Sequence, residues 1–152
     1  MLAWHFSAAD KKLGNGDGRL IVKGLTLKVD CEPVLCSIGL HASVKALDAL
    51  KYAPGHYLWR VKLGGTIVRG DDKCVATERT ALWGFDATNM LRHFARLCAL
   101  DVVHLWDCPD VVKRFLESGD ENLREAARDA TWAAQQKRLS SLIRRYAREV
   151  SP

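Results

Sequence analysis

The sequence contains no segment of the kind that places a protein in or across a membrane. Its 152 residues include no apolar run long enough to span a bilayer. The first residues, Met1 to Phe6, lack the basic start, the long apolar stretch and the cleavage site of a secretory signal. We therefore expect a cytoplasmic protein without a membrane partner.

The cysteine pattern excludes a disulfide framework. The five cysteines are odd in number and their spacing suggests no set of bridges, so reduced thiols are expected. Neither a CxxC nor an HxxxH pair is present, although structural zinc sites usually include such close pairs. Cys31, Cys36 and His41, completed by His104 and Cys108, are the residues that could still form a site. Because the spacing is unfavourable, we predict no bound metal.

What the sequence does contain is an ordinary globular composition. Hydrophobic residues make up 48% of the chain and charged residues 27%, and the formal net charge is +5. This length is typical of one domain, so we predict a single domain over residues 1–152. The mildly basic charge permits a nucleic acid as a partner without requiring one.

The chain changes character near residue 85. Short β-type runs and glycine turns precede this point, and helical periodicity follows it to the end. Segregated strands and helices predict an α+β fold, with residues 1–85 mainly β and residues 86–150 mainly α. The first part should hold an antiparallel sheet with one short helix, and the second part should be helical.

Alternating apolar residues, caps and turn residues predict the individual elements. Ser43 is the expected N-cap of a short helix, and Asp86 the expected N-cap of a helix running to about Trp106. Gly119 should end a third helix, and one long helix should follow it. Gly64-Gly65 is expected to form a turn. The predicted strands cover residues 4–6, 20–22, 25–29, 57–63, 66–68 and 74–82, and the predicted helices begin near residues 43, 86, 110 and 121.

The segment from Cys36 to Ser43 is the leading candidate for chemistry. It combines a thiol, an imidazole and a hydroxyl just before a predicted helix, where folds often present functional groups. His41 and Ser43 could form a base and a nucleophile. In the structural alternative, Cys36 packs in the core, His41 bonds to backbone and Ser43 caps the helix. Residue types alone leave both interpretations open.

His41, Ser43, Tyr57 and Glu78 also occur in an order similar to that of ADP-ribosyltransferases. These enzymes are small α+β folds that use a His or Arg, a Ser or Tyr, and a Glu on a late strand. In that interpretation His41 and Tyr57 would hold NAD, and Glu78 would stabilise the oxocarbenium-like ribose. In the alternative, Glu78 forms a surface ion pair of little energetic weight. NAD is expected only under the enzyme hypothesis, and otherwise we expect no cofactor.

The last predicted helix carries a dense group of basic residues near its end. They could contact phosphate groups or an acidic protein surface, or they could be solvated charges near a helix C-terminus. No nucleic-acid-binding motif accompanies them. These candidate binding residues are Lys137, Arg138, Arg144, Arg145 and Arg148.

The same helix carries an apolar stripe at helical spacing. A stripe of this kind needs a surface to pack on. Either the sheet or a second copy of the chain could provide that surface, so a homo-oligomer stays open. The stripe consists of Leu139, Leu142, Ile143, Tyr146 and Val150.

Several short motifs cluster between residues 35 and 83. They are Leu35-Cys36 with Gly39 to Ser43, Asp48 to Gly55, Asp72-Lys73, Ala76 to Arg79, and Leu82-Trp83. Together they resemble an uncharacterised domain family common in phages and prophages, with the pattern LCxxGLHAS followed by DALxYAPG. The alanine- and tryptophan-containing run over residues 126–134 is similar to the tails of that family.

This resemblance implies a viral or mobile-element origin, and hence the host cytoplasm as the setting. It favours an accessory protein that binds a host macromolecule, with a host protein or complex as the expected partner. Inhibition of host defence is expected only because other small phage proteins often act on host machinery. Two alternatives stay open: an ADP-ribosyltransferase-like enzyme that uses NAD, and a nucleic-acid-binding protein that uses the basic end of the last helix.

Overall fold

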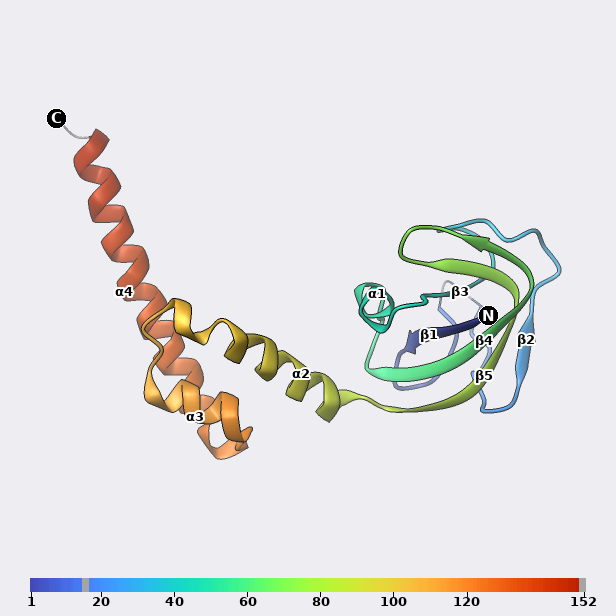
Figure 1. The fold of residues 1–152 in the computed structure, drawn as a ribbon, viewed down its shortest axis with the longest axis horizontal. Coiled ribbons are helices and arrows are strands. Elements are labelled where there is room, and N and C mark those ends of the chain that lie inside the picture. Colours follow the sequence, from blue (N-terminus) through green and yellow to red (C-terminus); the bar gives the residue numbers. More distant parts are fainter. Residues whose placement is uncertain (15–16, 151–152) are drawn as a thin grey trace. The chain divides into compact units, whose positions relative to one another are not determined.

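A computed structural model describes residues 1–14 and 17–150 of the chain (Figure 1). The chain divides into two compact units, residues 1–89 and 90–152, and each is described by itself. The first unit holds the strands and one short helix, and the second is helical. This arrangement confirms the predicted α+β class. The prediction of a single domain stays a prediction.

The first unit is built on an antiparallel sheet of five strands. The two longest strands, β4 (Tyr57–Arg69) and β5 (Cys74–Asp86), pair along most of their length and curve together (Figure 1). Strand β1 (Leu2–Ser7) pairs with β4, whereas β2 (Thr26–Lys28) and β3 (Leu40–Ala42) both pair with β5. The sheet thus gathers segments that lie far apart in the sequence.

The predicted turn at Gly64-Gly65 is wrong, because β4 runs straight through it. The two glycines instead mark a shift in the register between β4 and β5. Gly65 has a φ of +63°, and a Cβ there would collide with the Thr77 hydroxyl. The turn that connects the two strands comes later, where the Gly70 N–H donates to the Lys73 carbonyl at 2.8 Å. Glycines in a strand can therefore indicate a bulge as well as a turn.

The sequence predicts that residues 20–22 and 25–29 pair as a hairpin across Lys23-Gly24, and this hairpin does not form. The Ile21 N–H bonds to the Lys11 carbonyl and the Gly24 N–H to the Ala81 carbonyl, so these backbone groups are used elsewhere. Only Thr26–Lys28 becomes a strand, and Thr26 faces Thr80 of β5 with 2.7 Å between the hydroxyl oxygens. Cross-strand pairing with β5 replaces the local hairpin.

The predicted N-cap at Ser43 is also wrong. Helix α1 (Ala46–Lys51) begins after Lys45, which occupies the N-cap position without a side-chain bond. Ser43 is only 2% exposed and exchanges two backbone hydrogen bonds with Trp4, at 2.7 and 2.9 Å. Ser43 therefore ties the segment after β3 to β1.

Most of the predicted helical half is confirmed. The Asp86 carboxylate accepts the N–H of Thr88, the first residue of α2 (Thr88–Asp101), at 2.9 Å. Helix α2 ends earlier than expected, and a 3₁₀ turn (Val103–Leu105) follows it. Helix α3 (Asp110–Ser118) ends at Gly119, as predicted. A second 3₁₀ turn (Glu121–Leu123) leads into the long α4 (Arg124–Val150).

The two units differ in how much they bury. The first has a continuous core that includes Trp59, Val61 and Leu63 of β4, all at most 3% exposed. In the second, α3 packs on the beginning of α4, with Val112 and Ala127 buried. Among the described residues, no helix has both the length and the apolarity needed to cross a membrane.

Candidate functional site

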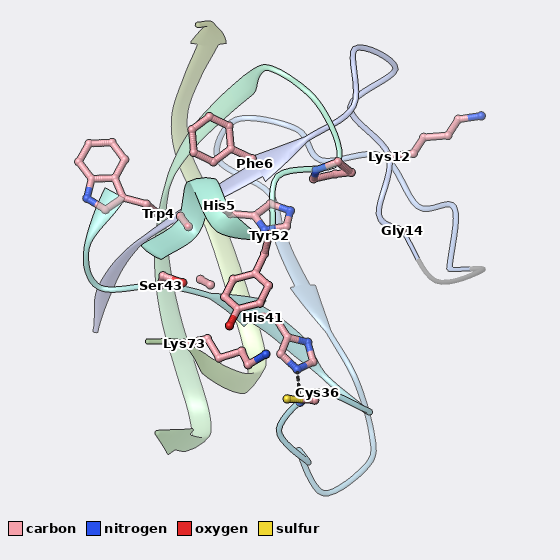
Figure 2. A pocket seen from close by; sticks show the side chains of 13 residues that line it. Trp4, His5, Phe6, Lys12, Gly14, Cys36, His41, Ser43, Tyr52 and Lys73 are labelled. Carbon is pink, nitrogen blue, oxygen red and sulfur yellow. Dashed lines mark hydrogen bonds between the residues drawn. The ribbon is translucent and has the colours of Figure 1, made fainter. Parts of the chain in front are cut away.

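The segment from Cys36 to Ser43 lines a pocket in the first unit, which we call the His41 pocket (Figure 2). Its volume is about 330 Å³. His41 lies on β3 and Ser43 directly follows that strand, so both predicted residues reach it. Tyr52 comes from the end of α1, and Lys73 from the turn before β5. The pocket thus depends on the pairing of β3 with β5.

The other two residues of the ADP-ribosyltransferase hypothesis do not line this pocket. The Tyr57 hydroxyl donates to the Gly84 carbonyl at 3.3 Å, and its ring lies 4.9 Å from that of Trp59. The Glu78 carboxylate forms an ion pair with Lys28 of β2, with 2.7 Å between Oε1 and the Lys28 Nζ. The structure therefore brings His41 and Ser43 together but leaves Tyr57 and Glu78 outside their pocket.

His41 holds the loop that precedes it. Its Nε2 accepts the N–H of Cys36 at 3.1 Å, and its Nδ1 lies 3.2 Å from the Gly39 carbonyl. Both bonds form together when the ring is neutral and carries its proton on Nδ1. Cys36 itself has a φ of +63°, which is uncommon for a residue with a side chain. His41 therefore acts here as a positioning residue for this loop.

Arg79 is the candidate site residue that the sequence patterns did not reveal. It lies on β5, is 3% exposed, and donates from Nη1 to the His41 carbonyl at 2.5 Å. Its Nη2 is buried and has no hydrogen-bond partner among the described residues. Burial lowers the pKa of Arg79 to about 10, so its guanidinium is charged at neutral pH. Residues two positions apart in a strand face the same side, so Arg79 shares a face with the buried Ala81. This spacing was the signal in the sequence that Arg79 faces inward.

The positive charge of Arg79 lowers the pKa of both histidines that line the pocket. Burial lowers the pKa of His5 well below 6.5, and the charges of Arg79 and His41 lower it further. Burial also lowers the pKa of His41; the Gly39 carbonyl opposes this change, and Lys73 and Arg79 add to it. Both rings are therefore neutral at neutral pH.

The rim of the pocket is formed by Tyr52 and Lys73. The Lys73 Nζ lies 4.1 Å from the centre of the Tyr52 ring, and the Tyr52 hydroxyl donates to Asp72 at 2.8 Å. Contact with the Cys36 thiol raises the pKa of Lys73. The motif residues Tyr52 and Asp72-Lys73, which are separated in the sequence, thus meet at one place. The sequence analysis had grouped the motifs that contain these residues, and that grouping could have indicated that they lie close together.

The second candidate surface is the exposed part of α4. Every described side chain from Gln135 to Arg148 is exposed. Five large apolar side chains lie within about 100° of the helix circumference, at about 100° per residue. From here on, the apolar stripe means Trp132, Leu139, Leu142, Ile143 and Tyr146, with exposed fractions of 64, 55, 37, 58 and 58%. This set adds Trp132 to the predicted stripe and omits Val150, whose side chain lies outside the described part of the structure.

The predicted binding residues of α4 lie on the opposite side of the helix. They fall within an arc of about 120°, centred away from the apolar stripe. No Asp or Glu occurs between residues 130 and 148, so this side carries charge of one sign. We call Lys137, Arg138, Arg144, Arg145 and Arg148 the cationic face.

No family model matches the chain, and neither the curated proteins nor the solved structures provide a significant match. The resemblance to a phage domain family therefore stays a prediction. Within the described residues, no three His, Cys, Asp or Glu side chains gather in a way that could hold a metal ion.

Proposed function

We propose that this protein is an accessory binding protein that docks on a host protein through α4. A single observation carries the proposal: the described part of α4 exposes an apolar stripe opposite a cationic face. Covering a large apolar side chain stabilises a complex by about 1.5–3 kcal/mol before the costs of association. An amphipathic helix with anchors at this spacing fits the hydrophobic groove of a partner.

The partner surface that best suits α4 is an apolar groove with acidic rims. Leu139, Ile143 and Tyr146 would enter the groove, because they lie within one narrow arc of the helix. The cationic face would lie along the acidic rims, where complementary charge speeds association and selects partners. The absence of acidic residues from 130 to 148 means that no charge on this stretch opposes such an approach.

Two other classes of macromolecule fit less well. A nucleic acid would contact the cationic face through its phosphates but would leave the apolar stripe in water. A lipid surface would cover the stripe, but Gln135 lies within the same arc and would lose its hydrogen bonds in an apolar medium. A protein groove can provide partners for an amide. The anti-defence role remains the part of the proposal that rests on the resemblance alone.

The test compares Leu139→Asp with Ser140→Asp. Both substitutions add one negative charge to neighbouring exposed positions, but only the first falls on the apolar stripe. We expect the parent chain and Ser140→Asp to capture the same bacterial protein from a nuclease-treated lysate, as read by mass spectrometry. Leu139→Asp should reduce the affinity for that protein, once purified, by about tenfold or more.

Three outcomes would contradict this proposal. Capture that disappears on nuclease treatment would indicate a nucleic acid as the partner. Co-sedimentation with anionic vesicles that Leu139→Asp abolishes would indicate a lipid surface. Equal affinities of the two variants would exclude the apolar stripe from the interface. Circular dichroism of both variants confirms that α4 is retained.

A further inference from the structure

We propose that the His41 pocket is a binding site for a small organic anion, with an apolar body and one phosphate or carboxylate head group. This proposal is independent of the proposed function of α4, because every residue that carries it belongs to residues 1–89. The pocket volume of about 330 Å³ lies within the range of small-molecule sites. Figure 2 shows Tyr52, His41 and Lys73 gathered along one side of it.

The charged side chains that line the pocket have one sign. They are Lys12 and Lys73, beside the neutral rings of His5 and His41, and none of the described lining residues is an Asp or Glu. Asp72 is not a lining residue; its carboxylate accepts from the Tyr52 hydroxyl at 2.8 Å and lies 3.5 Å from Lys51. A concave surface with charge of one sign concentrates ions of the opposite sign.

Lys73 is available for such an ion, whereas the side chain of Lys12 points away from Lys73 and His41 (Figure 2). Neither Lys12 nor Lys73 forms an ion pair with a described residue. The Lys73 ammonium contacts the Tyr52 ring and the Cys36 thiol, and its charge helps to lower the pKa of Asp72 without forming an ion pair with it. An anionic head group at the rim would therefore meet the ammonium of Lys73 without displacing an existing ion pair.

Arg79 provides the second part of the argument. Arg79 is 3% exposed, and its guanidinium bonds to the backbone of His41. The negative charge that acts on it is that of Asp17, whose carboxylate is already bonded to Arg19 at 2.7 Å. Burying a charge without a close partner is costly, and it persists where the surroundings compensate for it. An anion in the adjacent pocket would offset this positive field.

Apolar side chains provide the space for the body of the ligand. Phe6 of β1, Ala42 of β3 and Pro54 line the pocket, and Trp4 lines it at the edge, where its ring packs on Arg60 and Trp83. Apolar walls with a few polar groups in fixed positions are typical of small-molecule sites. The combination selects a ligand with one charged end and one aromatic or aliphatic end, rather than a free inorganic ion.

The experiment titrates the full chain with phenyl phosphate, benzoate and the neutral benzyl alcohol. Histidine ring and backbone amide NMR signals report on His5, His41 and Ser43. We expect saturable shifts at these residues with at least one of the two anions and none with benzyl alcohol. The bound anion should raise the pKa of His41, because it counteracts the positive charges of Lys73 and Arg79 that favour the neutral ring.

The matched variants are Lys73→Gln and Lys62→Gln. Each removes one positive charge from the first unit, but Lys62 is exposed on β4 and does not line the pocket. Lys73→Gln should weaken anion binding by about tenfold, whereas Lys62→Gln should leave it within about twofold. Equal weakening by both variants, equal binding of benzyl alcohol, or no saturable shift with either anion would overturn the proposal. Failure here would not affect the capture experiment on α4.

Discussion

The two units of this chain differ in how many apolar side chains they bury. In the first, Val61, Leu63 and Val75 are at most 1% exposed, and the sheet encloses them. In the second, α2 buries no side chain, and Ala127 is the one buried residue in the described part of α4. Both units expose large apolar side chains, such as Leu47 in the first and Ile143 in the second, but only the first also encloses a continuous core. Core residues of the first unit therefore maintain the fold, whereas the exposed residues of α4 are available for binding.

The largest expected effect comes from shortening a side chain in the core. Leu63→Ala should lower the free energy of unfolding by about 2–5 kcal/mol, because it removes buried methyl groups and leaves a cavity. Ile143→Ala, on the 58% exposed side chain of α4, should change it by less than about 0.5 kcal/mol. Urea unfolding of both variants measures the difference. Similar losses of unfolding free energy in the two variants would contradict the difference between the units, because they would mean that Ile143 is packed within the chain.

A smaller effect is expected from adding a methyl group beside the pocket. Gly39 has a φ of +118°, and a Cβ there would lie 2.5 Å from Cγ2 of Val75. Gly18 has a φ of +68°, but no described atom lies within 4 Å of such a Cβ. Both Ala variants strain the backbone, and Gly39→Ala more so, because a φ of +118° lies outside the left-handed region that alanine can adopt. With overpacking against Val75 added, Gly39→Ala should be less stable than Gly18→Ala by at least about 1–3 kcal/mol. Thermal unfolding gives the difference, and equal melting temperatures would show that the core around Val75 can yield.

The smallest effect is a pH dependence that originates in the first unit. The folded-state pKa of His5 is lowered below 6.5 by burial and by the charges of Arg79 and His41. Between the folded and unfolded pKa values, the unfolded chain binds a proton that the folded chain does not, so stability rises with pH. Stability should therefore fall as the pH decreases below about 6.5.

The check is the slope of the unfolding free energy between about pH 5 and pH 7 in two variants. His5→Gln should reduce the slope, because it removes the titrating ring. His104→Gln, at an exposed position in the second unit, is the control and should keep the slope of the parent chain. An unchanged slope in His5→Gln would assign the acid sensitivity to another group.

Part of the fold and part of the site could be predicted from the sequence. Alternation along residues 57–63 is a local property, and it lies within β4 as predicted. Gly119 ends α3 in a left-handed conformation, which a glycine adopts readily. Residues 20–22 and Ser43 were misjudged, because the partners of their backbone groups come from distant segments.

The candidate site shows the same division. The sequence pointed to His41, and His41 does line a pocket of the first unit. It could not show that Arg79 lies behind His41, since 38 residues separate the two and only the pairing of β3 with β5 brings them together. Nor could it show that Glu78, next to Arg79 in the chain, faces Lys28 instead.

By itself, the sequence determined the class of the fold, the change from strands to helices near residue 85, and the opposed apolar and basic sides of α4. These properties depend on neighbours within one or two turns of a helix or a few residues of a strand, so periodicity encodes them directly. Only the tertiary structure decided that β2 and β3 share β5, that Ser43 bonds to Trp4, and that Arg79 stands behind the His41 pocket. Such pairings join segments far apart in the chain and are selected by the burial of the whole core, which no local pattern records.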